Sequence, residues 1–131
     1  MLGKIVLWVS ALSFISYGLA CLLDPSLPAG YAGLAIENGD GFAEIGAMYG
    51  GLQTGFGLLC LVGALRAEAY RPALFMIVVV IGLLAVARLY SGLVAVDAVG
   101  GYTWGAMGYE FATAILAALA LRGSTREAAT A

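Results

Sequence analysis

The stretch that most constrains the fold of this chain is 42–59, which reads FAEIGAMYGGLQTGFGLL. It is apolar enough to enter a membrane, yet it holds five glycines, each of which weakens a helix in water by about 1 kcal/mol relative to alanine. In lipid, apolar side chains gain nothing from helix contact, so small residues that let backbones approach closely become the packing surface. The pairs Gly46–Gly50 and Gly51–Gly55 both have the GxxxG spacing, and we expect them to be helix-packing residues.

Composition places the whole chain in a membrane. Its 131 residues are 63% hydrophobic and 11% charged, whereas an ordinary soluble domain has about a quarter charged residues. This chain therefore cannot cover a soluble surface, and we expect a single integral membrane domain over residues 1–131. The net charge of −2 and the lack of a basic run argue against nucleic acid as a partner.

Four apolar runs, each of 17 to 24 residues, are close to the ~20 residues that cross the hydrocarbon as a helix. They predict an all-α fold, an integral membrane four-helix bundle. The predicted spans are 5–23, 42–65, 73–94 and 105–121, with outer loops at 24–41 and 95–104. Asp24-Pro25 ends the first span, because proline disfavours helical geometry in the residue before it. Pro72 suits the first turn of the third span, where its missing N–H is not needed.

Basic residues predict the orientation of the four spans. Five of the six lie on the side of the termini: Lys4, Arg66, Arg71, Arg122 and Arg126. Because cytoplasmic loops carry an excess of Lys and Arg, both termini are expected to be cytoplasmic. Only Arg88 departs from this pattern.

The two cysteines are expected to be unpaired. Cys21 lies near the outer end of the first span and Cys60 near the inner end of the second, about 24 Å along the helix from Glu44. A disulfide needs α-carbons within roughly 7 Å of each other. Both thiols are therefore interpreted as small apolar fillers.

One cluster of polar residues lies at similar depth on three predicted helices. Arg88 is 16 residues into the third span, about 24 Å from its cytoplasmic end. Glu44 opens the second span, Glu110 is one turn into the fourth, and Asp97 lies in the loop above. An unpaired charge at this depth is costly, so Arg88 is expected to pair with the two glutamates.

The cluster has two interpretations. It is either a structural ion pair that sets the helix register, or a ligand or ion site open to the outer side. Deeper in the second span, Tyr49 and Gln53 are expected to hydrogen-bond between helices. A polar trail from Glu44 to Gln53 is the alternative, but on an α-helix Gln53 faces nearly opposite Glu44.

Nothing in the sequence supports enzyme chemistry. The chain has no histidine, which removes the commonest general base and a common metal ligand. It has no Ser/His or Cys/His pair, no phosphate-binding glycine loop and no metal cluster, and a carboxylate pair without a cleft is a weak acid–base signal. We expect no catalytic residue, no cofactor and no metal.

The polar positions carry a resemblance to a known family. They are Tyr17-Gly18-Leu19 with Asp24-Pro25, Glu44 followed by Tyr49-Gly50-Gly51-Leu52-Gln53, Arg88-Leu89 before Ser91, Asp97 and Glu110. This pattern, over nearly the whole chain, resembles family 4345 of the bacterial domains of unknown function. The glycine usual after the loop aspartate is displaced here to Gly100 and Gly101. The resemblance implies a four-span protein of the bacterial cytoplasmic (inner) membrane, broadly similar to DoxX-like proteins, and brings no established activity.

Three functions remain open. The first is a non-enzymatic accessory or assembly subunit, in a larger membrane complex or a homo-oligomer, that docks through faces rich in glycine and alanine. The second is binding or permeation of a small polar molecule, ion or lipid head group at an outer pocket around Arg88. The third is a quinone- or thiol-linked redox role, which rests only on the analogy with DoxX-like proteins.

Overall fold

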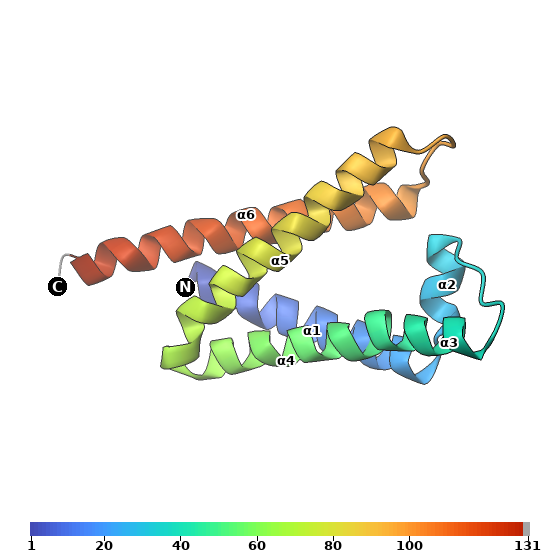
Figure 1. Ribbon diagram of the computed structural model, residues 1–131. Coiled ribbons are helices and arrows are strands. Elements are labelled where there is room, and N and C mark those ends of the chain that lie inside the picture. The colour runs from blue at the N-terminus through green and yellow to red at the C-terminus, as the bar shows by residue number, and fades with distance from the viewer. Residues whose placement is uncertain (130–131) are drawn as a thin grey trace. The chain divides into compact units, whose positions relative to one another are not determined.

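The computed structural model describes the backbone of residues 1–129 and the side chains of residues 1–123, and within that part every regular element is helical (Figure 1). Four helices are long and apolar enough to cross a membrane: Leu2–Leu23, Gly39–Leu65, Ala67–Val94 and Gly101–Gly123. The predicted all-α class with four spans is confirmed. The Arg126 side chain, used above for the orientation, and residues 130 and 131 of the predicted domain lie outside the described part.

The contacts divide the chain into two compact units. The N-terminal unit is Trp8–Leu61, and the C-terminal unit combines Met1–Leu7 with Val62–Ala131. The organisation of residues 1–131 as one domain stays a prediction.

In the N-terminal unit, α1 (Leu2–Leu23) ends just before Asp24-Pro25, as the proline predicts. The predicted outer loop 24–41 is wrong in part, because it contains the short helix α2 (Ser26–Ala32). Pro25 already has helical backbone angles at the start of α2, which its ring favours. Gly33 ends α2 with a φ of +69°, a left-handed conformation that glycine adopts without steric cost.

The second span is built from three consecutive helical segments. These are α3 (Gly39–Ile45), the π-helical turn η1 (Gly46–Gly51) and α4 (Leu52–Leu65). The span begins three residues before the predicted Phe42, since the Asn38 side chain accepts a hydrogen bond from the Gly41 backbone N–H at 2.9 Å and caps α3. In η1 the Leu52 N–H donates to the Ala47 carbonyl five residues back, so this segment carries one more residue than a regular α-helical turn.

Glycines bring α1 and the second span into backbone contact. A Cβ atom built on Gly50 would lie 2.7 Å from Leu22 Cα. A Cβ atom built on Gly18 would lie 2.5 Å from the backbone nitrogen of Thr54. A Cβ atom built on Gly57 would lie 2.7 Å from the backbone nitrogen of Ile15. Next to these contacts the rings of Phe14 and Phe56 meet edge to face, with centroids 4.8 Å apart. The two helices therefore pack as closely as their backbones allow.

The predicted packing glycines contribute unequally to this contact. Gly50 makes the close approach, and Gly46 is in ordinary contact with the Pro25 ring, 3.6 Å from a built Cβ. Gly51 and Gly55 have no atom within 4 Å of a built Cβ. The expectation that Gly51 and Gly55 pack inside the bundle is therefore not met within this unit. The reason is helical phase, because both glycines lie on a side of the helix turned away from α1.

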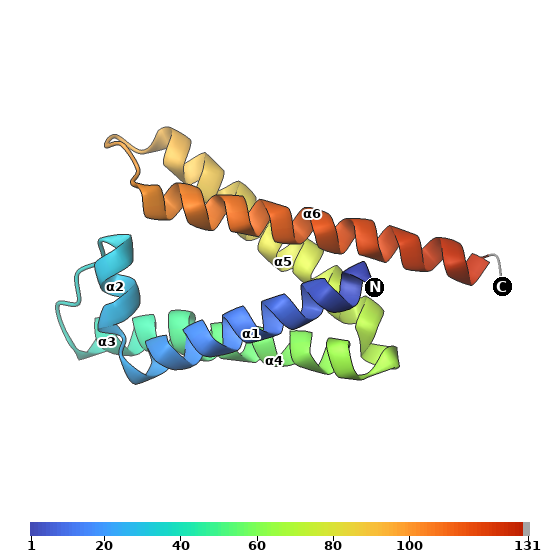
Figure 2. The same cartoon turned by 180° about the vertical axis from the view of Figure 1, so that it is seen from behind.

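The C-terminal unit is dominated by α5 (Ala67–Val94) and α6 (Gly101–Ala129), two antiparallel helices joined by the loop 95–100, as two opposite views show (Figures 1 and 2). Both begin earlier than the predicted spans, α5 at Ala67 and α6 at Gly101. In α5, the residues Ala67, Glu68 and Ala69 are compatible with a helical turn ahead of the apolar run. Pro72 consequently lies inside α5, and its expected place in the first turn is wrong. A proline there removes one backbone hydrogen bond.

Residues at helical spacing form the buried stripes of this hairpin. On α5 they are Leu74, Ile77, Ile81 and Ala85, and on α6 they are Met107, Glu110, Ala114 and Ala117. Steps of three and four residues place each set on one side of its helix. A Cβ built on Gly82 would lie 3.8 Å from Ala114 Cβ, which is an ordinary contact between α5 and α6.

The close approach at Gly50 predicts a sharp difference between two glycines of the same span. Gly50→Ala should lower the free energy of unfolding by about 1–3 kcal/mol, because the new methyl group would overlap the Leu22 backbone. Gly55→Ala is the matched control, with no neighbour to displace and a gain in helix propensity of about 1 kcal/mol at most. Unfolding in detergent measures both, and equal stability of the two variants would contradict this packing.

Candidate functional site: an ion pair within the spans

The candidate site is centred on one ion pair that joins α5 to α6. Arg88 Nη2 donates to Glu110 Oε1 at 2.7 Å, and Arg88 Nε donates to Oε1 and Oε2 at 3.0 and 2.9 Å. One edge of the planar guanidinium thus meets both carboxylate oxygens. This two-point, charge-assisted arrangement is the strongest form of hydrogen bond between side chains, and it fixes direction as well as distance.

The helices place this pair inside the apolar part of the hairpin. Arg88 lies six residues before the end of α5 and Glu110 nine residues after the start of α6, which is about 9 and 14 Å along the helix axes. The Glu110 side chain is 6% exposed and the Arg88 side chain 26%. Glu110 belongs to the buried stripe of α6, and Arg88 continues the stripe of α5 one turn beyond Ala85.

The burial and the charge of the Arg88–Glu110 pair determine how α5 and α6 align. An isolated charge at this depth is costly, whichever scale is used, but the two opposite charges of Arg88 and Glu110 neutralise each other. Only one registration of α5 against α6 brings the guanidinium onto the carboxylate. The pair therefore specifies that registration, whatever further role it has.

Within the C-terminal unit, the other candidate residues take no part in this pair. Asp97 is exposed in the loop 95–100 and forms no ion pair with residues 62–123 of its unit. Ser91 is exposed one turn after Arg88 on α5. Glu44 is an exposed residue of α3 in the N-terminal unit, and its pairing with Arg88 stays a prediction.

The π turn changes the expected relation between Glu44 and Gln53. On a regular α-helix nine residues separate them by about 180° of rotation. With one residue inserted by η1, the separation falls to about 80°, so the two side chains share one half of the span's surface. Tyr49 lies within η1, and both Tyr49 and Gln53 are partly buried. Within residues 8–61 neither side chain makes a hydrogen bond, so their expected interhelical bonds are not formed in this unit.

Two features of this region were missed in the sequence. The π turn has no sequence signal beyond the glycine-rich run GAMYGG. Thr54 packs against Gly18, and its hydroxyl oxygen is buried without a hydrogen-bond partner in the described part of the chain. The pairing of Gly18 with Gly50 and Thr54 depends on how α1 lies against the second span, which a linear motif does not contain.

The cysteine prediction is confirmed. Cys21 and Cys60 are both free and buried, so they pack as small apolar side chains. Among the described residues, no group of three or more His, Cys, Asp or Glu side chains is arranged to hold a metal ion.

Comparison with known proteins assigns the chain to a family. A domain of unknown function, DUF4345, matches residues 2–121. The chain belongs to the DUF4345 family. No curated protein and no solved structure matches it. The matched range in this DUF4345 protein contains both members of the ion pair and nearly all of the four candidate spans.

The ion pair predicts an asymmetry between single and double substitution. Arg88→Gln should lower the free energy of unfolding by about 3–5 kcal/mol, because it leaves the Glu110 carboxylate buried without its partner. The double variant Arg88→Met with Glu110→Leu removes both charges at similar volume, and should recover stability to within about 1 kcal/mol of the wild type. Reversible unfolding in detergent or bicelles measures both. Additive losses in the double variant would mean that the two side chains are not coupled.

Proposed function

We propose that this DUF4345 protein is a non-enzymatic subunit that assembles within the membrane, with a second copy of itself or with a larger membrane complex, through the outward side of α6. The observation that supports the proposal is a row of small residues on α6 that its own unit leaves uncovered. Gly101, Gly105 and Gly108 have no atom within 4 Å of a built Cβ. Ala112 continues the row and is exposed.

Helical geometry places this row opposite the ion pair. Relative to Gly105, the other three small residues lie within about 60° around the helix axis, whereas Glu110 lies about 140° away. One side of α6 therefore packs on α5, and the opposite side presents four small residues over about 16 Å. Exposed Tyr102 and Tyr109 flank the row, and further along α6 the exposed residues are the large Ile115, Leu116 and Leu119.

The uncovered glycines support a helix contact on this part of α6. Lipid tails are as apolar as leucine, so helices in a bilayer associate where small residues allow close packing. Gly101 to Gly105 has the GxxxG spacing, and Gly108 to Ala112 has the same spacing with a small residue in place of the second glycine. We include in the proposal that both termini face the cytoplasm, because five of the six basic residues of the sequence lie on their side of the predicted spans. We also include that the membrane is a bacterial inner membrane, as the family resemblance implies.

A second function is supported by the uneven burial of the ion pair. Glu110 is almost covered, whereas Arg88 keeps 26% of its side chain exposed. That exposed part would face a small polar molecule, an ion or a lipid head group in an outer pocket. A lipid-embedded experimental structure tests this function directly: ligand density against the exposed side of Arg88 supports it, and acyl chains packed there contradict it.

The assembly proposal predicts that bulk on the small side of α6 breaks the association. Gly105→Leu and Gly108→Leu should shift the protein from an oligomer or complex to a monomer, because each leucine holds the neighbouring helix away. Cross-linking in native membranes, followed by mass measurement in mild detergent, gives the assembly state. Gly105→Ala, which adds one methyl group, should weaken the association much less.

Gly30→Leu provides the matched control. Gly30 has open space around it but lies on α2, outside the four candidate spans, so this variant should assemble like the wild type. A wild-type protein that stays monomeric both in membranes and in mild detergent would overturn the proposal. Equal loss of assembly in Gly30→Leu and Gly105→Leu would also overturn it.

A further inference from the structure

A cavity of about 620 Å³ lies at one end of the C-terminal unit. Four chain segments surround it: the first turn of α1, the last residues of α4, the start of α5 and the α6 residues 119–123. Each of these segments is an end of a candidate span. The cavity is therefore at the level where the spans leave the hydrocarbon, at the opposite end of the hairpin from the Arg88–Glu110 pair.

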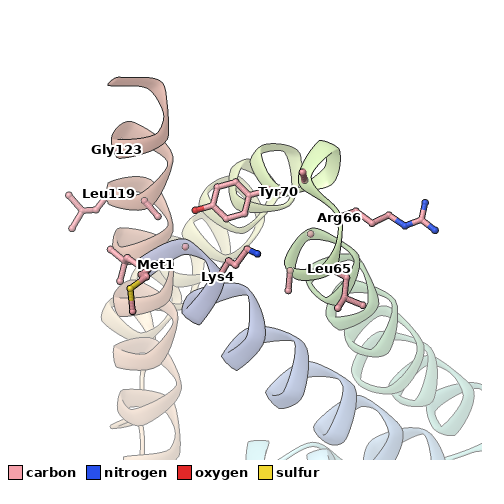
Figure 3. A pocket seen from close by; sticks show the side chains of 13 residues that line it. Met1, Lys4, Leu65, Arg66, Tyr70, Leu119 and Gly123 are labelled. Carbon is pink, nitrogen blue, oxygen red and sulfur yellow. The ribbon is translucent and has the colours of Figure 1, made fainter. Parts of the chain in front are cut away.

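The cavity wall combines positive charge with an apolar surface. Among residues 1–123, Lys4 and Arg66 line it, and no aspartate or glutamate does. Leu65, Leu119 and Ala120 supply apolar wall. Figure 3 shows the Lys4 side chain between Tyr70 and Leu65, whereas Arg66 extends outward from the junction of α4 and α5. Lys4 is thus the inner cation of the cavity, and Arg66 is a cation at its rim.

The polar groups of the cavity have no partner of their own. Among the described residues, the side chains of Lys4, Arg66 and Tyr70 take part in no ion pair or hydrogen bond. The Tyr70 hydroxyl is held against the first turn of α1, where it contacts Gly3 so closely that a Cβ at that position would overlap it. A hydroxyl donor is therefore fixed at the wall of a cavity that two unpaired cations also line. This is the opposite of the neutralised arrangement at Arg88.

The start of α5 offers backbone N–H donors to the cavity, and the acidic residue of its first turn, Glu68, does not line the cavity. Ala67, its first residue, lines the cavity, and Arg66 at the N-cap position makes no side-chain hydrogen bond that would cap the helix. The first N–H groups of a long helix are unsatisfied donors with a partial positive charge, and anions bind there. Lys4, Arg66 and this helix start favour the same class of ligand.

From these observations we infer that the cavity binds a phosphate group, with the head group of an anionic phospholipid as the source that its position favours. Lys4 and Arg66 would balance the phosphate charge, and Tyr70 would donate to a phosphate oxygen. The leucines and Ala120 would contact the glycerol and the upper acyl chain. Basic pockets between spans bind anionic head groups by this combination of charge and apolar contact. The site is separate from the proposed assembly surface on α6 residues 101–112 and does not depend on it.

The test uses the full-length protein in a mild uncharged detergent. Phosphatidylglycerol, phosphatidylcholine and inorganic phosphate are titrated separately, and bound ligand is counted by native mass spectrometry. Phosphatidylglycerol should bind best. The double variant Lys4→Gln with Arg66→Gln should weaken its binding about 30-fold, since each basic residue near a membrane surface contributes about fivefold. Tyr70→Phe should weaken binding less, because it removes one donor and keeps the ring.

Arg122→Gln is the matched control. Arg122 is an exposed basic residue at the same end of α6 and does not line the cavity, so this variant should lose much less phosphatidylglycerol binding than the double variant. If the wild type binds inorganic phosphate and the double variant does not, the site is a phosphate site whose ligand is free phosphate. Equal binding of the two lipids, or equal loss in Arg122→Gln and in the double variant, would overturn the inference. Circular dichroism confirms that each variant remains helical.

Discussion

The C-terminal hairpin depends on the neutralisation of one charge inside the hydrocarbon. Arg88 and Glu110 each carry a cost that a lipid environment makes large, and the two-point contact between them removes most of that cost. Apart from Glu110 and Thr113, the described buried residues of α5 and α6 are apolar, and such surfaces slide over one another with little change in energy. The ion pair differs from these contacts because its hydrogen bonds form in one relative alignment of the two helices. It ties the helix register to a single arrangement, and it leaves the other side of α6 available for contacts outside the hairpin.

The N-terminal unit packs differently, through glycines, which have no side chain to separate the two helices. At Gly18, Gly50 and Gly57 the backbones of α1 and the second span come so close that a methyl group would overlap its neighbour. The π turn η1 accompanies this contact and adds one residue to the span, which rotates everything after it. One unit is thus specified by charge and the other by close backbone packing. In a bilayer both are substitutes for the hydrophobic driving force that soluble bundles use.

Polar groups also line the cavity at the opposite end of the hairpin from the ion pair. Lys4, Arg66 and Tyr70 lack partners among the described residues, yet they lie where water and head groups would meet the spans. The charge excess at this end is visible in the sequence as the pattern of basic residues. Its concentration around one cavity is not, because Lys4 and Arg66 are 62 positions apart in the chain.

The sequence by itself determined the class of protein. Its apolar runs, its scarcity of charge and its prolines were enough to predict four helical spans, and the depth of Cys21 and Cys60 was enough to predict free thiols. Depth also predicted that Arg88 would need an acid, because depth follows from counting residues along a helix. The tertiary structure decided which acid that is within the C-terminal unit, which glycines meet a neighbour, and where the second span takes its π turn. These depend on rotation about the helix axes and on the approach of segments distant in the chain, and a change of a single residue in register alters them without altering composition or span length.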